Sequence, residues 1–377
     1  MPALRLLRLS LSQFRSYARL TWQPAGRIVV IAGANGSGKT NLLEAISLLV
    51  PGRGLRGARI GDLVRRGATA WAVNGRFATP EGPVEIATGT PPDGPADRRV
   101  FRLDGVAPRS QAELAAHAAA VWLTPQMDRL FQEGPSGRRR FLDRLTFALE
   151  PGHAREVAAF DTAMAQRNRL LAERRDDRAW LAGLEESMAR HAVAATAARM
   201  GLVARLNATP AGAFPQARMA LLCPIAARLA ERPALEVEDW LRGALEAGRG
   251  ADAASGSSAL GAHRADMGLE DAASGLPAAL ASTGQQKALL IGVVLAHAAL
   301  LAEARGAAPL LLLDEPVVHL DAGRRAALFA ALVAGPAQCF MTGTDSDVFA
   351  PLRGVAEGVR TGDEGLDADP AFPAPGA

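Results

Sequence analysis

The sequence has 377 residues, of which 49% are apolar, and a formal net charge of +3. It contains no uninterrupted apolar run of the roughly 18 residues that a membrane-spanning helix needs, and Arg5, Arg8 and Arg15 interrupt any apolar leader segment. Cys223 and Cys339 lie far apart and form no metal-binding or disulfide motif, which predicts a reducing, cytoplasmic location. A pI of about 9.3 permits a polyanionic partner without requiring one.

The N-terminal part of the chain has the patterns of several strands. Residues 4–14 alternate in polarity and are expected to form an edge strand beside the strand 28–32, which precedes a glycine-rich turn. Asn74-Gly75 and Asp104-Gly105 indicate hairpin turns, and 91–94 a loop. The other strands expected here are 71–77, 84–88, 100–103 and 119–123.

The segment from Gly33 to Thr40 has the form GxxxxGK[ST] and lies between a buried-strand pattern and a helical pattern. Its glycines allow backbone N–H groups to turn toward an anion, Lys39 can reach the outer phosphates of a nucleotide, and the Thr40 hydroxyl can bind Mg²⁺. Although the chain has 42 lysines and arginines, its only other lysine is Lys287. We therefore predict a site for ATP and Mg²⁺. The predicted nucleotide contacts are Gly33, Ala34, Asn35, Gly36, Ser37, Gly38, Lys39, Thr40 and Asn41.

From about residue 127 to residue 260 the pattern is helical and rich in alanine and arginine. Apolar residues at alternating steps of three and four, from Leu181 to Leu202, predict a short coiled-coil-like helix. Its partner helix includes Phe160, and 174–177 forms the tip of the hairpin. His191 lies on the seam and is interpreted as a packed core histidine. Residues 249–258 are expected to form a loop.

Beyond residue 265 the alternation of helices and strands resumes. The apolar run Leu310–Leu313 ends in Asp314 and Glu315. In a buried parallel strand such carboxylates lie at the C-terminal edge, beside the phosphate site. We expect Asp314 to bind Mg²⁺ and Glu315 to align or deprotonate the attacking water. Glu315, Lys39 and Asp314 are therefore the predicted catalytic residues.

A second anion site is predicted at the start of the helix that follows Ser282. Ser282, Gly284 and Gln285 offer a hydroxyl and backbone amides at a helix N-terminus. Because one nucleotide has a single γ-phosphate, we expect this second site to face the nucleotide of another copy of the chain. The sequence thus predicts an ATP-dependent homodimer.

The order of these motifs matches the ABC-type ATPase layout, in which two heads enclose two ATP molecules. Asp321 then resembles the D-loop aspartate, and Thr344 follows the last strand, where transporter ATPases carry a switch histidine. Gln126 is the candidate glutamine for a Mg²⁺ contact, and Gln132 is the alternative.

The patterns predict an α/β fold, an ABC-type ATPase head with a phosphate-binding loop, a mostly parallel sheet and an antiparallel β-subdomain. A mainly helical second lobe with the helical hairpin interrupts this head. The expected boundaries are 1–125 for the first part of the ATPase lobe, 126–262 for the helical lobe, 263–361 for the rest of the ATPase lobe and 362–377 for a disordered tail.

The chain resembles the RecF family of bacterial recombinational-repair ATPases over nearly its whole length. The similarity is carried, in family order, by segments 14–17, 36–45, 134–143, 166–168, 261–266, 284–287 and 342–345. Two positions differ from the usual pattern: Ala262 replaces a proline, and Glu315 replaces the second aspartate of many members.

The resemblance implies a slow, DNA-stimulated ATPase that binds duplex or gapped DNA near single-strand/duplex junctions. It also implies RecO-type and RecR-type mediator proteins as partners in loading a recombinase. Arginine guanidinium groups suit contacts to the phosphate backbone, so Arg53, Arg56, Arg59, Arg138 and Arg139 are the predicted DNA contacts. The alternative for each cluster is a solvated or internally paired surface.

Two other functions remain open. The chain could be the energising subunit of a membrane transporter, which the missing switch histidine and the large helical insertion disfavour. It could also be a DNA clamp in which ATP binding matters and turnover does not.

Overall fold

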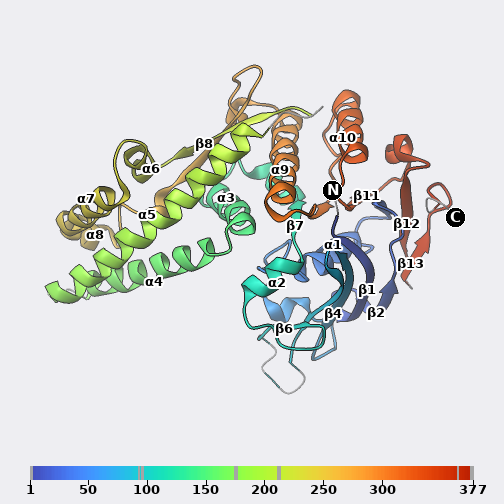
Figure 1. The fold of residues 1–377 in the computed structure, drawn as a ribbon, viewed down its shortest axis with the longest axis horizontal. Helices are drawn as coiled ribbons and strands as arrows, with labels where there is room; N and C mark the ends of the chain where they lie inside the picture. The colour runs from blue at the N-terminus through green and yellow to red at the C-terminus, as the bar shows by residue number, and fades with distance from the viewer. Residues whose placement is uncertain are drawn as a thin grey trace. The chain divides into compact units, whose positions relative to one another are not determined.

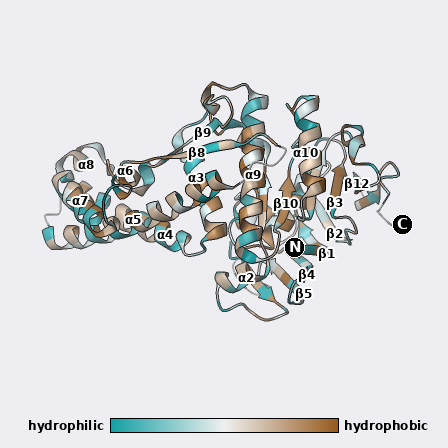
Figure 2. Ribbon diagram, turned by 45° about the horizontal axis from the view of Figure 1, so that its top comes forward, coloured by the Kyte–Doolittle hydropathy of each residue, from teal (hydrophilic) through white to brown (hydrophobic). Residues whose placement is uncertain are grey.

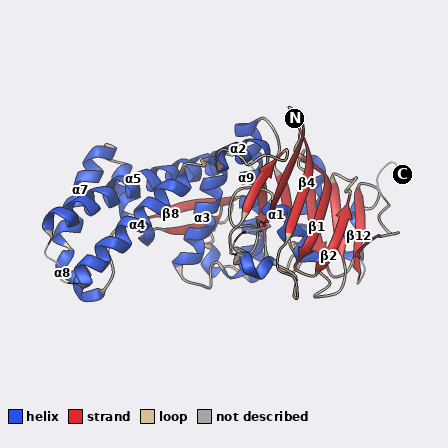
Figure 3. Cartoon of the chain, turned by 90° about the horizontal axis from the view of Figure 1, so that it is seen from below, coloured by secondary structure: helices blue, strands red, loops and turns tan. Residues whose placement is uncertain are grey.

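A computed structural model describes residues 3–91, 94, 97–173, 177–209, 214–362 and 365–373 (Figure 1). The chain forms two compact units. The first comprises Met1–Asp128, Pro210–Gln216 and Ser282–Ala377, and the second comprises Arg129–Thr209 and Ala217–Ala281. Strands are concentrated in the first unit and helices in the second (Figure 3).

A six-stranded sheet in the order β13-β12-β3-β11-β10-β7 forms the centre of the first unit. Its strands are β3 (Ile28–Ala32), β7 (Ala120–Leu123), β10 (Leu310–Leu313), β11 (Cys339–Gly343), β12 (Ala356–Gly362) and β13 (Gly365–Ala368). Neighbouring strands are parallel except β12 and β13. The four strands β3, β7, β10 and β11 are buried along their whole length, so their sequences do not alternate in polarity (β3 and β10 are labelled in Figure 2). Three of them are continuous apolar runs, and β11 ends in Thr342 and Gly343. The helices adjoining these strands in the chain are α1 (Lys39–Leu48), α9 (Thr283–Arg305) and α10 (Ala322–Ala334).

A five-stranded antiparallel sheet in the order β2-β1-β4-β5-β6 belongs to the same unit. Its strands are β1 (Arg5–Phe14), β2 (Tyr17–Trp22), β4 (Ala72–Thr79), β5 (Gly82–Gly89) and β6 (Val100–Leu103), and the short helix α2 (Gln111–His117) follows β6. The expectation that residues 4–14 form an edge strand beside 28–32 is wrong, because β1 pairs with β2 and β4. Alternating polarity identified the strand but not the sheet to which it belongs.

The predicted hairpin turn at Asn74-Gly75 is also wrong, because both residues lie inside β4. A Cβ at Gly75 would collide with the Leu49 side chain at the end of α1. This glycine therefore makes room for the helix that packs on the sheet. Of the predicted loop 91–94, residues 92 and 93 lie outside the described residues.

The expectation of a disordered tail from residue 362 needs correction for residues 365–373. There β13 pairs with β12, and Phe372 is only 1% exposed. The Phe372 carbonyl accepts a hydrogen bond from Gly358 N–H at 2.8 Å. The sequence did not predict this short strand because glycine and small or acidic residues surround its single large apolar residue, Leu366. Residues 363, 364 and 374–377 lie outside the described part of the chain.

The second unit is mainly helical, and with it the predicted fold class is confirmed. Its elements are α3 (Pro135–Leu149), α4 (His153–Ala172), α5 (Arg178–Ala208), β8 (Ala217–Leu222), α6 (Pro224–Leu229), α7 (Ala234–Ala247), α8 (Arg249–Ser255) and β9 (Asp266–Asp271). The predicted hairpin consists of α4 and α5, whose seam residues Leu181, Met188 and Leu202 are buried. The tip residues 174–176 are not among those described.

Two predictions for this unit are wrong. His191 is not a core residue: its side chain is 21% exposed, and Nδ1 lies 2.7 Å from Glu156 Oε2. The predicted loop 249–258 contains the helix α8. The predicted lobe boundary at residue 262 stays a prediction. Because β9 pairs with β8, the compact unit itself continues to Ala281.

Among the described helices, α9 alone is long and apolar enough to cross a membrane by length and composition. In the structure 67% of that apolar window is buried inside the protein, and α9 packs against β7. A core helix passes the same composition test, so this is weak evidence for a membrane span. The expectation of no membrane partner stays a prediction.

Candidate nucleotide-binding site

The glycine-rich turn connects β3 to α1 and curls around the ammonium of Lys39. Lys39 Nζ donates to the carbonyl oxygens of Gly33 at 2.7 Å and Ala34 at 2.8 Å. Gly38, directly before α1, has a φ of 98°, a left-handed value that a side chain would strain. The predicted contacts Ala34, Asn35 and Gly36 are exposed, and Gly33, Ser37, Thr40 and Asn41 are partly exposed. Residues 34–36 of the loop are therefore open to solvent, while the Lys39 ammonium is hydrogen-bonded to the carbonyl oxygens at the start of the loop.

The acidic residues at the end of β10 lie beside this loop. Thr40 Oγ1 donates to Asp314 Oδ1 at 2.9 Å, and Asp314 is only 3% exposed. Burial lowers the pKa of Lys39, whereas the negative charges of Glu315 and Asp314 act to raise it. A hydroxyl and a carboxylate oxygen in contact are hard oxygen ligands of the kind that Mg²⁺ prefers. The residues predicted to hold Mg²⁺ thus fit that ion.

Thr342, near the C-terminal end of β11, contacts both acids. The sequence included it in the segment 342–345 that carries the resemblance but assigned it no role. Its hydroxyl is fully buried, donates to Asp314 Oδ1 at 2.7 Å and accepts the backbone N–H of Glu315 at 2.9 Å. The prediction named Thr344 instead, which is exposed two residues further along the chain. The register of β11 against β10 pairs Leu313 with Met341, which brings Thr342 level with the acids.

The start of α9 has the geometry of a capped helix. Ser282 Oγ accepts the N–H of Gln285 at 3.4 Å, and Gln285 Oε1 accepts the N–H of Ser282 at 2.9 Å. A Cβ at Gly284 would collide with the carbonyl oxygen of His319, so the glycine is needed for close packing within the same chain. Asp321 caps α10 by accepting the N–H of Arg324 at 2.8 Å. Ser282 and Asp321 remain exposed.

Gln126 lies in the short 3-10 helix Pro125–Arg129 and is exposed. This helix follows β7, which is parallel to β10, so Gln126 leaves the sheet at the same edge as Asp314. Gln132 belongs to the second unit. The position of Gln126 in the same unit as the phosphate-binding loop favours it over Gln132.

The arginines predicted to contact DNA differ in their surroundings. Arg53 and Arg59 are exposed, and within the described residues their side chains make no hydrogen bond or ion pair. Arg56 instead donates to Asn41 Oδ1 at 2.8 Å and to Glu44 Oε2 at 3.1 Å.

The second-unit arginines have internal partners. Arg138 uses Nε and Nη2 to grip both carboxylate oxygens of Asp266, at 2.7 and 2.9 Å, and its side chain is 14% exposed. Arg139 is partly buried and donates to the Ala265 carbonyl at 3.3 Å. Burial and the neighbouring charge of Arg199 lower the pKa of Arg139. The Arg138 guanidinium is therefore engaged with a carboxylate of its own unit and is not a free cation for a DNA phosphate.

A buried carboxylate ties the basic segment after α1 to the phosphate-binding helix. Glu44 is 1% exposed and accepts hydrogen bonds from Arg15 Nε at 2.8 Å and Arg15 Nη2 at 2.9 Å, in addition to the one from Arg56. Tyr17 donates to the Gly38 carbonyl at 3.2 Å from the same β1–β2 turn. The sequence signal for these contacts was the segment 14–17, which the resemblance singled out without assigning a role.

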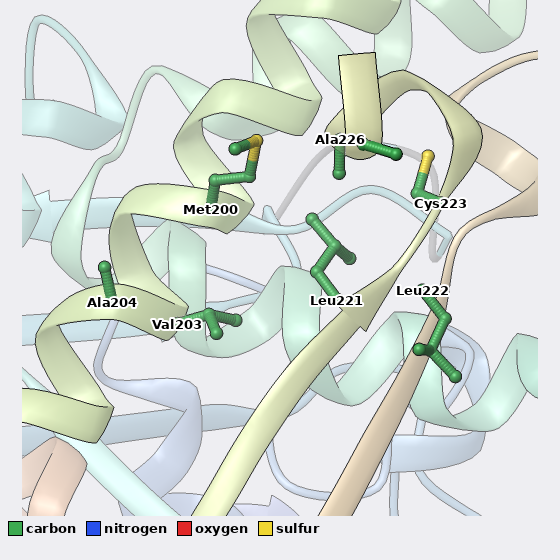
Figure 4. Close-up of a pocket in the computed structure, with 8 residues that line it drawn as sticks. Met200, Val203, Ala204, Leu221, Leu222, Cys223 and Ala226 are labelled. Carbon is green, nitrogen blue, oxygen red and sulfur yellow. The ribbon is translucent and has the colours of Figure 1, made fainter. Parts of the chain in front are cut away.

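An apolar pocket of about 470 Å³ lies in the second unit (Figure 4). Met200 and Val203 from α5, Leu221 and Leu222 from β8, and Cys223 and Ala226 beside them form its wall. This lining offers no charged group to phosphate oxygens, so the pocket does not fit a nucleotide.

The fold and the site together define a P-loop ATPase head of the type found in RecF and SMC proteins. Residues 8–69 match the family model described as AAA domain. The chain is 46% identical over 366 residues to the DNA replication and repair protein RecF of Mesorhizobium japonicum, covering 95% of this chain and 96% of that protein. It is 47% identical over 354 residues to the protein of the same description from Agrobacterium fabrum, covering 92% and 94%. The chain belongs to the RecF family.

Solved structures show the same fold. A structure described as the recombination mediator protein RecF-ATPrS in the RecFOR pathway superposes with a TM-score of 0.83 at 22% identity, covering 97% of this chain and 98% of that one. The Smc head domain with an extended coiled coil from Pyrococcus furiosus gives a TM-score of 0.51 at 18% identity, covering 97% and 96%. The resemblance to RecF stated from the sequence is confirmed.

Proposed function

We propose that this protein is an ATP-dependent DNA-binding protein of recombinational gap repair and replication restart, acting in the cytoplasm with RecO-type and RecR-type mediators. The observation that carries the proposal is the convergence of Lys39, Thr40 and Asp314 at one edge of the parallel sheet, in a chain that belongs to the RecF family. The relatives are described as DNA replication and repair proteins, and the similar solved structure as a recombination mediator.

The residues of this chain divide the work of ATP hydrolysis. Backbone amides of residues 33–41 and the ammonium of Lys39 bind the phosphates. Thr40 and Asp314, with Gln126, would hold Mg²⁺, which neutralises charge on the phosphates when it is bound. Glu315 accepts a proton from the attacking water, and the products are ADP and inorganic phosphate.

Binding of ATP brings two copies of the chain together in this proposal. Ser282, Gly284 and Gln285 of one copy face the nucleotide held by the other, with Asp321 and Thr344 nearby. The exposure of Ser282 and Asp321 supports such a contact. The Ser282→Arg variant should bind ATP as a monomer but form no ATP-dependent dimer and hydrolyse no ATP. Sedimentation that shows normal dimers of this variant would exclude the arrangement.

Contacts to DNA come mainly from the exposed Arg53 and Arg59, because Arg56 and Arg138 are engaged within the protein. Replacing Arg53 or Arg59 by alanine should reduce the salt dependence of duplex binding by about 0.9 log unit per lost phosphate contact, with little effect of base sequence. Arg56→Ala should leave this slope unchanged while weakening the anchoring of its segment to α1. A strong preference for one duplex sequence at fixed salt would contradict backbone recognition.

Two variants test the role of turnover. Lys39→Met should lose ATP binding, and Glu315→Gln should bind ATP, dimerise and trap DNA without hydrolysis. If Glu315→Gln cells repair gapped DNA as well as wild-type cells, turnover is dispensable and the protein is a clamp that needs only ATP binding. If neither variant alters DNA binding, the proposed function is wrong.

A further inference from the structure

Lys287 is a buried cation that the nucleotide site described above does not use. It lies five residues after Ser282 on α9 and is 1% exposed. Its ammonium donates to the backbone carbonyl oxygen of Glu315 at 2.9 Å and to Asp128 Oδ2 at 3.2 Å. All of these residues belong to the first unit. Lys287, on the helix whose N-terminus is the predicted second anion site, is thus hydrogen-bonded to the backbone of Glu315, the predicted catalytic acid.

The backbone of Glu315 is in a conformation that needs support. Its φ is 49°, a left-handed value that costs a residue with a side chain of order 1–3 kcal/mol unless the surroundings hold it. Thr342 holds the N–H of this residue, and Lys287 holds its carbonyl oxygen. With both peptide groups anchored, the direction of the Cα–Cβ bond is determined, and with it the region that the carboxylate can reach.

We propose that Lys287 is a positioning residue for Glu315, which couples the start of α9 to the direction of the catalytic carboxylate. The proposal rests on the proposed role of Glu315 in ATP hydrolysis. Gly284 packs directly on the His319 carbonyl, so the first two turns of α9 contact Glu315 and the segment after it at two places. A shift of this turn when Ser282 meets the nucleotide of a second copy would move the ammonium and reorient Glu315.

The competing explanation is that Lys287 and Asp128 form only a stabilising ion pair. Removing Lys287 alone would leave Asp128, whose side chain is 15% exposed, without its cation, and would lower stability for a reason unrelated to Glu315. The pair Lys287→Met with Asp128→Asn avoids this unpaired charge. It restores electrical neutrality and removes the ammonium that donates to the Glu315 carbonyl.

The experiment compares wild-type protein, Lys287→Met and the neutral pair, with ATP affinity, ATP-dependent dimerisation, thermal unfolding and kcat as readouts. We expect the neutral pair to bind ATP, to dimerise and to recover much of the stability lost in Lys287→Met, while kcat stays about 100-fold below wild type. A matched control neutralises an ion pair of the second unit in which Arg199 is 1% and Asp143 23% exposed, Arg199→Met with Asp143→Asn, and should leave kcat unchanged. Recovery of wild-type kcat in the Lys287–Asp128 neutral pair would overturn the proposal.

Combining the Lys287–Asp128 neutral pair with Glu315→Gln distinguishes a positioning role of Lys287 from a general loss of folded structure. If Lys287 acts through Glu315, adding the neutral pair to Glu315→Gln lowers the small residual single-turnover rate no further, because residues that act as a unit are not additive. A further drop by the same factor as in the wild-type background would contradict the proposal. If the neutral pair does not fold, Lys287→Arg takes its place, since it keeps the charge beside Asp128 but moves the donor. A wild-type kcat for that folded variant overturns the proposal, and a tenfold or larger loss supports it.

The same measurements distinguish the failure of this proposal from the failure of the proposed function. Wild-type protein without ATPase activity would refute the hydrolysis proposed at this site, on which the role of Lys287 rests. Wild-type activity that Glu315→Gln abolishes and the Lys287–Asp128 neutral pair retains would refute only the role of Lys287.

Discussion

The substitution Thr342→Val removes a single hydroxyl that holds both acids of the nucleotide site. Valine has nearly the same shape as threonine, so the packing of the fully buried side chain is retained. The hydrogen bond to Asp314 at 2.7 Å and the one from the Glu315 N–H at 2.9 Å are both lost. Asp314 Oδ1 keeps its hydrogen bond from Thr40, so the Glu315 N–H is the group left unsatisfied. A buried group left unsatisfied costs about 1–3 kcal/mol, so the ends of β10 and β11 should lose about that much local stability.

Hydrogen exchange of the β10 and β11 amides measures this loss without requiring that the two units unfold together. Because Glu315 also loses one of its two anchors, kcat should fall by tenfold or more while ATP still binds. Thr88→Val is the matched control: the Thr88 hydroxyl is buried, donates to the Val100 carbonyl at 2.9 Å and accepts from Arg99 Nε at 2.8 Å. It should lower stability but not kcat. Unchanged exchange and unchanged kcat in Thr342→Val would refute the role given to this hydroxyl.

Two further predictions concern other parts of the chain. Burial acts to raise the pKa of Asp143, but hydrogen bonds from His153 and Arg199 outweigh it, so the pKa lies below the ordinary value of 3.8. Because the folded pKa is the lower one, this stabilisation is present above pH 3.8 and is lost as the pH falls toward the folded pKa. Acid unfolding of the second unit, followed by hydrogen exchange, should be less steep in Asp143→Asn, and an unchanged slope would contradict this. Gly284→Ala should force α9 away from the His319 carbonyl and abolish ATP-dependent dimers in sedimentation while ATP still binds; normal dimers would show that this close packing is not required.

The phosphate-binding loop could be predicted because its chemistry is carried by adjacent residues. The same holds for Asp314 and Glu315, which follow an apolar run, and for the turn at Asp104-Gly105, where φ is 48° and 80°. Thr342 could not be predicted, since its role depends on the register between β10 and β11, which local patterns do not specify.

The prediction of DNA-contacting arginines was limited because the partner of an arginine side chain cannot be read from its sequence neighbours. Composition and spacing cannot distinguish an exposed arginine from one that meets a distant carboxylate. Arg53 and Arg56 are close in the sequence, yet only Arg56 reaches Glu44, which lies on the preceding helix. Arg138 finds Asp266, which follows it by 128 positions. Such pairs form only after the chain has folded, so their partners are absent from any local sequence window.

The use of lysine at only two positions has a common physical reason in the structure. Lys39 and Lys287 both donate to backbone carbonyl oxygens of irregular segments, those of Gly33, Ala34 and Glu315. A tetrahedral ammonium directs three donors from one compact point, so it can bind a carbonyl and an anion together in a small buried space. The planar guanidinium spreads its donors over a wider fork, which suits carboxylate pairs such as Arg138 with Asp266 but not these narrow positions. Arg138 also holds a carboxylate and backbone carbonyl oxygens, but it does so from separate nitrogens of its fork. The two lysines make their contacts from a single nitrogen, which distinguishes these positions in a chain so rich in arginine.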